Sequence, residues 1–379
     1  FGGQGRTVEY RESLYVGYRY HQTAGIPAAF PFGYGLSYTA FSMDARKVTA
    51  DEKTVSLTVT VTNTGSVYAG REVVQIYGSA PREGLEKPWQ VLAAFGKTKL
   101  LQPGESQTLT ISFPLTNLES YDPAKAAYVL EAGEYVIRMG RNSRSTRIAA
   151  ILTLDGTAMT KQVKNICPLD VEFQEISAAD AAPYSYPEED AEKAAAPVIA
   201  LHAAKVETVT VDYADEPAPF APANIEHVIT VEEVRDGKYT MEQLVSQLTL
   251  EEMADLCVGA ARDNDSVIGA ASKAVPGAAG ETSMRLAYRG IRDMVNADGP
   301  AGLRLIPHFR TDAQGNLLPG GSSMAGMETG LGEKKEGEVD FYQYCTAVPI
   351  AWLLASSWDL QLIEDIGDMV GEEMEQFGV

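Results

Sequence analysis

A carboxylate and a guanidinium stand six residues apart in the heptapeptide DGPAGLR, which runs from Asp298 to Arg304. Pro300 fixes its own φ angle and lacks an amide hydrogen, and the two glycines allow unusual backbone angles, so the stretch predicts a turn. In such a turn the carboxylate accepts hydrogen bonds and the guanidinium donates them, which suits recognition of a small polar ligand. Alternatively, Asp298 caps the next element and Arg304 is a solvated surface charge.

The residues before this turn indicate how the two charges are positioned. Residues 290–297 predict a short buried strand that leads into the turn, so both charges would project from the carboxyl end of a strand. In a β/α barrel, ligands bind at that end of the strands. Far upstream, residues 55–65 alternate between apolar and polar side chains and end in a turn, which is typical of a β-sandwich strand.

Further stretches of the sequence resemble glycoside hydrolase family 3. The resemblance is carried by residues 10–20, 30–39, 81–97, 248–257, 298–304, 357–359 and 371–374. The first two stretches are similar to the end of the family's second domain, and the third resembles a pattern in its fibronectin-III-like domain. The other four are similar to the beginning of its catalytic barrel, so the usual domain order is reversed. A subset of bacterial β-glucosidases in the family resembles this permuted layout.

The resemblance implies a multidomain chain. Its segments are the C-terminal tail of an α/β sandwich domain (1–38), a fibronectin-III-like β-sandwich (39–154), an acidic linker rich in Ala and Pro (155–238) and the N-terminal part of a TIM-like catalytic β/α barrel (239–379). Residue 1 is Phe rather than Met, and the helical pattern before Val379 has no C-cap. We therefore expect an internal fragment, whose remaining segments come from a second chain or from a missing part of the same enzyme.

The resemblance also implies roles for individual residues. In the family, the Asp of the DGPAGLR-like motif binds the glucosyl unit at the non-reducing end and the Arg lines the same pocket, which assigns substrate binding to Asp298 and Arg304. The family's nucleophile Asp and acid/base Glu have no counterpart in this chain, so we assign no catalytic residue. Asp359 is interpreted as a helix N-cap, and Glu9 and Glu12 as surface carboxylates.

The implied activity is that of a retaining, exo-acting β-glucosidase, of which this chain is a part. Such an enzyme hydrolyses terminal non-reducing β-D-glucosyl residues of oligosaccharides or glucosides with two carboxyl groups. A β-xylosidase or another β-glycosidase of the family is an alternative, since it differs only in how the pocket treats the C4 and C6 positions of the sugar. A non-catalytic fibronectin-like interaction module is a second alternative.

The loop between Thr311 and Asp340 is longer and more polar than a barrel connection requires. Loops at an active face often shape the side of the site that holds the leaving group, although a disordered excursion is equally consistent with the composition. Aromatic residues flank this loop: Phe309, Phe341, Tyr342 and Tyr344. They predict either stacking on sugar rings or ordinary buried packing.

The formal net charge of −21 disfavours nucleic acid and anionic membranes as partners. Between Asp170 and Asp236, sixteen acidic residues stand against three basic ones, which predicts a solvated linker. Within it, the apolar patches 206–211 and 225–231 are candidates for strands that dock locally. The longest apolar run is too short to span a bilayer. The sequence neither requires nor excludes a homo-oligomer.

The cysteines and histidines give no sign of a cofactor. Cys167, Cys257 and Cys345 are scattered without paired spacing, so they predict neither a disulfide framework nor a zinc site, and they indicate a reducing, cytoplasmic compartment. The four histidines are equally dispersed, and the paired glycines lack the strand and helix of a phosphate loop. We expect no metal and no nucleotide cofactor.

Overall fold

The computed structural model describes residues 8–169, 171, 174–213, 224–258, 275–282, 284–318, 321–322 and 328–379. The chain divides into two compact units, Phe1–Tyr213 and Ala214–Val379, and each is treated separately below. In the described parts of both units, every helix is too short or too polar to cross a lipid bilayer.

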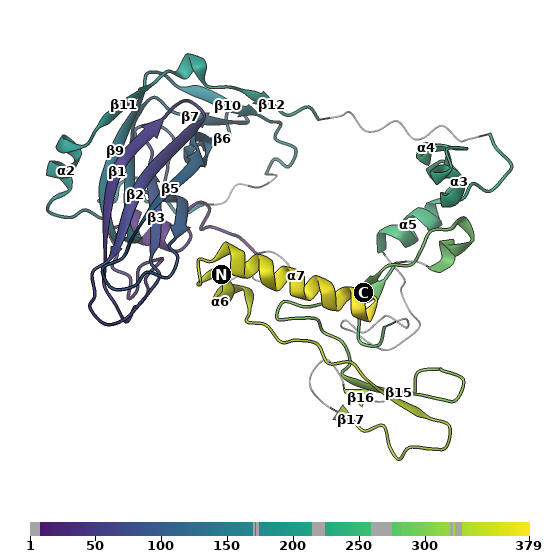
Figure 1. Ribbon diagram of the computed structural model, residues 1–379. Helices are drawn as coiled ribbons and strands as arrows, with labels where there is room; N and C mark the ends of the chain where they lie inside the picture. Colours follow the sequence, from purple (N-terminus) through teal and green to yellow (C-terminus); the bar gives the residue numbers. More distant parts are fainter. Residues whose placement is uncertain are drawn as a thin grey trace. The chain divides into compact units, whose positions relative to one another are not determined.

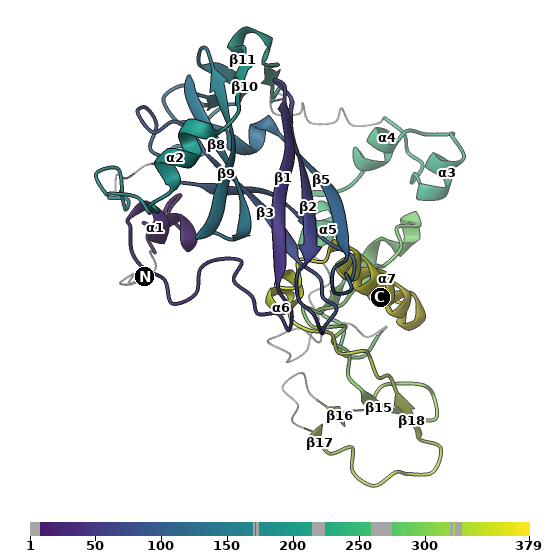
Figure 2. The same cartoon turned by 60° about the vertical axis from the view of Figure 1, so that its left-hand side comes forward.

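The first unit is a β-sandwich made of mostly antiparallel sheets (Figures 1 and 2). One sheet has the order β1 (Phe41–Ala50), β2 (Thr54–Asn63), β5 (Ser106–Pro114). The second has the order β11 (Val198–Leu201), β9 (Ser145–Leu154), β8 (Gly133–Asn142), β3 (Val73–Ser79), β4 (Val91–Lys97). The third has the order β12 (Val209–Thr210), β10 (Ala158–Gln162), β7 (Ala127–Leu130), β6 (Ser120–Asp122). The helical elements are α1 (Tyr18–Thr23), η1 (Leu115–Leu118), α2 (Glu189–Ala195) and η2 (Ala203–Lys205).

Strand β2 explains how the sandwich forms. Its side chains alternate between buried and partly exposed positions, so the predicted alternating strand is confirmed. On the inner face, Leu57 belongs to one buried cluster with Ile76 and Ile137 of the second sheet, and all three are 0% exposed. Burying each of these side chains stabilises the fold by roughly 1.5–3 kcal/mol. On the outer face, the Thr60 and Thr108 hydroxyls form a hydrogen bond of 3.1 Å between β2 and β5.

Part of the stretch 155–238, predicted as a solvated linker, is folded onto the sandwich. Strand β10 pairs antiparallel with β7, β11 pairs parallel with β9, and β12 pairs parallel with β10. The linker interpretation is therefore wrong for β10 and β11, whereas β12 lies in the apolar patch 206–211, for which a locally docked strand was expected. The linker prediction was based on composition. Composition does not reveal a strand that gains its hydrogen bonds by pairing with a sheet formed by earlier residues.

Helix α2 shows where several of the acidic residues of this stretch find partners. Glu189 Oε1 lies 2.7 Å from Arg138 Nη2, and Glu192 Oε1 lies 2.7 Å from Arg147 Nη1. The Arg138 side chain is only 5% exposed, and its guanidinium lies 4.3 Å from the centroid of the Trp89 ring. These carboxylates are thus ion-pair partners of arginines on β8 and β9 rather than solvated linker charges.

The N-terminal residues 8–38 pack on the sandwich without adding a strand. The Thr23 hydroxyl oxygen accepts a hydrogen bond from the Trp89 amide at 2.8 Å. The Tyr15 hydroxyl donates to Glu86 Oε1 at 2.7 Å, and burial, followed by this hydrogen bond, raises the pKa of Tyr15 to about 12. The segment is therefore held by specific side-chain contacts with the loop between β3 and β4.

The second unit consists of short elements. Its helices are α3 (Val231–Arg235), α4 (Met241–Val245), α5 (Leu250–Val258), η3 (Met284–Arg289), α6 (Ala351–Ala355) and α7 (Leu360–Phe377). Its strands are β13 (Gly280–Glu281), β14 (Val295–Asn296), β15 (His308–Thr311), β16 (Gly321–Ser322), β17 (Glu328–Thr329) and β18 (Val339–Tyr342). Between the described residues, these strands pair only as antiparallel two-stranded sheets. The β/α barrel units predicted for 239–379 therefore stay a prediction.

The buried strand predicted for residues 290–297 is wrong in its length and its burial. Only Val295–Asn296 is a strand, and Met294 is 64% exposed. Gly290 has a positive φ of 74°, which does not fit a regular strand. In addition, among the residues that the structure describes, β14 pairs only with the two-residue β13, and one short neighbour cannot bury a strand.

Both ends of α7 have caps. The Asp359 side chain accepts a hydrogen bond from the Leu362 amide, which confirms its predicted role as N-cap. At the other end, Gly378 is the C-cap, with a left-handed φ of 75°. The expectation that this helix lacks a C-cap was therefore wrong, because glycine adopts this conformation without steric cost.

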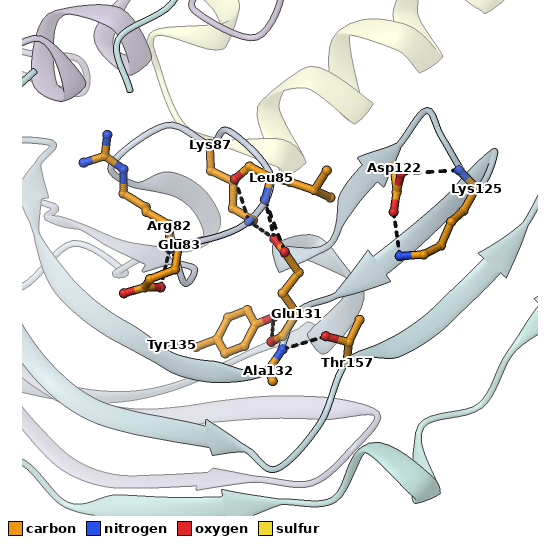
Figure 3. A network of polar contacts seen from close by, with 10 residues as sticks. All are labelled: Arg82, Glu83, Leu85, Lys87, Asp122, Lys125, Glu131, Ala132, Tyr135 and Thr157. Carbon is orange, nitrogen blue, oxygen red and sulfur yellow. Dashed lines mark hydrogen bonds and ion pairs between the residues drawn. The ribbon is translucent and has the colours of Figure 1, made fainter. Parts of the chain in front are cut away.

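A buried ion pair fixes the loop between β3 and β4 of the sandwich (Figure 3). Lys87 Nζ contacts Glu131 Oε2 and donates to the Leu85 carbonyl at 2.9 Å, while the Leu85 amide donates to the Glu131 carboxylate at 3.2 Å. The Lys87 and Glu131 side chains are 6% and 18% exposed. A Cβ atom at Gly84 would lie 1.9 Å from Glu131 Oε1, so a side chain there would displace the Glu131 carboxylate from its present position.

We predict that Glu131→Gln lowers the free energy of unfolding by about 3 kcal/mol, because it leaves the buried Lys87 ammonium without its counter-charge. The double variant Lys87→Met/Glu131→Gln should recover a large part of this loss, since no unpaired charge remains and the Gln oxygen still accepts from Leu85. Urea unfolding followed by far-UV circular dichroism measures both values.

Asp44→Asn is the matched control. Asp44 pairs with Arg46 at 2.7 Å, but both side chains are more than half exposed, so we expect a change below about 0.5 kcal/mol. If Glu131→Gln is as mild as Asp44→Asn, the buried pair does not stabilise the sandwich.

Candidate substrate-binding site

The structure brings Asp298 and Arg304 together, as the sequence predicts for a turn. Arg304 Nη1 lies 3.0 Å from Asp298 Oδ2, and the Arg304 amide donates to the Asp298 carbonyl at 2.7 Å. The two side chains are 48% and 40% exposed. Both charged groups are therefore accessible to a ligand. An exposed ion pair of this kind adds little to stability.

Two glycines allow the backbone of this turn to fold closely. Gly302 has φ 96°, and a Cβ atom there would lie 2.0 Å from the Thr346 carbonyl oxygen. A Cβ atom at Gly299 would lie 2.6 Å from the Gly302 oxygen. The Val348 amide donates to the Ala301 carbonyl at 3.1 Å. The turn is therefore packed against the backbone of residues 346–348.

Two polar side chains join this region to neighbouring segments. Glu373 on α7 accepts a hydrogen bond from the Thr346 amide, at 3.1 Å to each carboxylate oxygen. Gln343 donates from its side chain to the Pro276 carbonyl at 2.7 Å. Neither role was predictable from the sequence, because each side chain contacts a backbone group far away in the sequence. A family motif included Glu373 without indicating this contact.

Cys345 lies in the same region. Burial, followed by the charge of Glu373, raises the pKa of the Cys345 thiol. All three cysteines are free thiols. A thiol with a raised pKa is a poor nucleophile at neutral pH, so Cys345 has no evident catalytic part here.

The long loop between Thr311 and Asp340 closes a hairpin formed by β15 and β18. Arg310 is 6% exposed, and its Nε atom lies 2.7 Å from Asp340 Oδ1. Hydrogen bonding from Arg310 is the main cause that lowers the pKa of Asp340, and His308 and Lys334 act in the same direction. The hairpin is therefore fixed by a charged cluster rather than by an apolar core.

The remaining sequence candidates have structural roles. Glu9 lies 2.5 Å from Arg11 in an exposed ion pair, as expected of a surface carboxylate. Glu12 is partly exposed. Asp359 caps α7. These carboxylates offer no pair suited to glycoside hydrolysis.

Comparison with known proteins gives two kinds of match. A family model described as a fibronectin type III-like domain matches residues 72–143, inside the sandwich predicted for 39–154. Beta-glucosidase A of Butyrivibrio fibrisolvens is 31% identical over 403 residues, covering 97% of this chain and 43% of that protein. A beta-glucosidase of Ruminococcus albus is 34% identical over 307 residues, covering 78% of this chain and 30% of that protein. The chain thus spans less than half the length of these relatives.

A solved structure agrees with these matches. The crystal structure of a beta-glucosidase from Paenibacillus barengoltzii superposes with a TM-score of 0.70 and 28% identity, covering 98% of this chain and 37% of that protein. Because one alignment follows almost the whole chain in both cases, the segments occur in the same order in these relatives. Sequence and fold together relate this chain to the β-glucosidases of glycoside hydrolase family 3.

Proposed function

We propose that this chain is part of a retaining, exo-acting β-glucosidase that hydrolyses terminal non-reducing β-D-glucosyl residues. The observation that carries the proposal is the accessible Asp298–Arg304 pair on a closed turn, in a chain that aligns with a β-glucosidase over 97% of its length. That extent also favours an enzyme over a separate interaction module, since the fibronectin-like match covers only residues 72–143.

In the proposed site, Asp298 and Arg304 bind the non-reducing glucosyl unit. The Asp298 carboxylate accepts hydrogen bonds from two neighbouring sugar hydroxyls, and such charge-assisted bonds are roughly twice as strong as neutral ones. Arg304 Nη1, 3.0 Å from Asp298 Oδ2, neutralises part of the carboxylate's charge, and its remaining N–H groups donate to the sugar. Together they orient the anomeric carbon for attack.

The bond-breaking groups are proposed to lie in other segments of the enzyme. A retaining mechanism needs a carboxylate nucleophile and a carboxylic acid about 5–5.5 Å away from it. In our proposal, residues 239–379 begin the β/α barrel that carries the nucleophile, and residues 1–38 end the α/β sandwich domain that carries the acid/base. A cytoplasmic location fits the three free thiols.

We expect Asp298→Asn to lower kcat/KM for an aryl β-glucoside about a hundredfold or more, on the order of 3 kcal/mol, in the enzyme that contains this chain. The physical reason is the loss of a charge-assisted anchor whose hydroxyl contacts strengthen as the sugar ring distorts toward the transition state. Arg304→Ala should also lower activity. Steady-state kinetics at constant melting temperature measures both effects.

Asp365→Asn is the control for Asp298→Asn, because Asp365 lies on α7 and accepts a hydrogen bond of 2.9 Å from the Gln361 side chain one turn earlier on the same helix. It should leave kcat/KM unchanged. Near-full activity in a well-folded Asp298→Asn variant would show that Asp298 is only a turn residue. Parallel measurements with β-galactosides and β-xylosides identify the sugar that the pocket prefers.

Gly302→Ala should increase hydrogen exchange at the Arg304 and Val348 amides about tenfold or more, because the new methyl group collides with the Thr346 carbonyl. Gly315→Ala is the control, since Gly315 also has a positive φ, 85°, but nothing lies within 4 Å of its added Cβ. Equal exchange at these two amides in both variants would contradict a role for the close approach.

A further inference from the structure

Three aromatic rings form a row on the β15–β18 hairpin. The His308 and Tyr342 rings are stacked with centroids 4.4 Å apart and planes inclined by 7°, and the Tyr342 and Tyr344 rings follow at 6.1 Å and 23°. Tyr342 is 61% exposed and Tyr344 is 72% exposed. Both tyrosines are therefore exposed in this structure, and buried packing, the alternative that the sequence left open, is wrong for them.

The pairing register fixes which side of the hairpin carries this row. His308 lies opposite Tyr342, and Phe309 lies opposite Phe341. Successive side chains of a strand point to opposite faces, so the His308–Tyr342 pair and the Phe309–Phe341 pair lie on different faces of the hairpin. The two phenylalanine rings stack on each other at 5.2 Å and 11°.

Charged groups hold the row in position. The His308 ring nitrogen Nε2 lies 3.1 Å from Asp340 Oδ1, the same oxygen that Arg310 Nε contacts at 2.7 Å. Lys334 Nζ lies 3.1 Å from Asp340 Oδ2. The ring at one end of the row is thus oriented before any ligand arrives, which reduces the ordering entropy that binding costs.

The backbone links the row to the segment that packs against the Asp298–Arg304 turn. Tyr344 stands two residues before Thr346, whose carbonyl oxygen faces Gly302 in the Asp298–Arg304 turn. Gln343, between the two tyrosines, donates from its backbone to the Pro307 carbonyl at 3.0 Å. These backbone contacts connect the row directly to the segment that carries Asp298.

We propose that the row of His308, Tyr342 and Tyr344 binds the sugar units on the leaving-group side of a β-linked gluco-oligosaccharide. This inference rests on the proposed β-glucosidase function. A pyranose ring presents a face of C–H groups, which packs on the electron-rich face of an aromatic ring, and Tyr adds a hydroxyl group for hydrogen bonding. Exposed aromatic side chains lose little conformational entropy when they bind, because they have only two χ angles.

The length of the row fits an extended ligand better than a short apolar one, which one ring could bind. An exo-acting enzyme holds the terminal glucosyl unit at one position, so further units of the oligosaccharide extend away from it in one direction. An extended series of rings on the segment that packs against the Asp298–Arg304 turn suits this shape. A single aryl leaving group would occupy only the nearest ring.

The test uses the double variant Tyr342→Ala/Tyr344→Ala of the enzyme that contains this chain. We expect kcat/KM for cellotriose to fall about tenfold, mainly through KM, while kcat/KM for methyl β-D-glucoside, which has no leaving-group ring, stays within about twofold. Tyr344→Phe should retain most of the activity on cellotriose, since the ring remains. Phe341→Leu, on the opposite face of the hairpin, is the matched control and should change neither substrate.

Several outcomes would overturn the proposal. Unchanged cellotriose kinetics in the double variant, an equal loss with methyl β-D-glucoside, or a loss confined to p-nitrophenyl β-D-glucoside would each show that the row does not bind sugar units. If the parent enzyme hydrolyses no β-glucoside, the proposed function fails, and calorimetric titration with cellotriose then decides the inference separately. Binding that the double variant weakens supports the row, whereas equal binding or no binding in the parent enzyme refutes it.

Discussion

The close backbone contact between the Asp298–Arg304 turn and residues 346–348 is the constraint on which the candidate site depends. The large buried cluster of the chain extends from Phe41 to Leu201, so it stabilises the sandwich and not this turn. The turn is instead held by backbone hydrogen bonds such as that from Val348 to Ala301. Its geometry therefore depends on glycine at 302 more than on any apolar side chain, because a side chain there would separate the two segments.

Features set by residues close in the sequence were predictable. The alternation in β2, the N-cap at Asp359 and the pairing of Asp298 with Arg304 each involve at most a few neighbouring residues. Local patterns of this kind reflect the periods of strands, the needs of helix ends and the angles available to glycine and proline. The fibronectin-like type of the sandwich followed from such patterns together with the resemblance.

Features set by distant partners were not predictable. Glu189 on α2 pairs with Arg138, 51 residues earlier, and Glu373 accepts from the Thr346 amide, 27 residues earlier. Composition alone treats such carboxylates as solvated, because it does not show which cation or amide the fold brings to them. The same limit explains the error at 290–297, where burial depends on neighbouring strands and not on the apolar content of the segment.

The aromatic residues near the long loop show how register decides between two readings of one sequence. Composition allowed either burial or exposure for Tyr342, and the antiparallel pairing with β15 sets its ring beside His308 on one face of a two-stranded hairpin. Two strands have no second layer of their own, so stability has to come from polar contacts, here the Arg310–Asp340 pair. Because that pair fixes the hairpin, the aromatic face does not need to be buried for the hairpin to fold. The exposed ring row of this charge-stabilised hairpin is therefore free to contact a ligand without unfolding the hairpin.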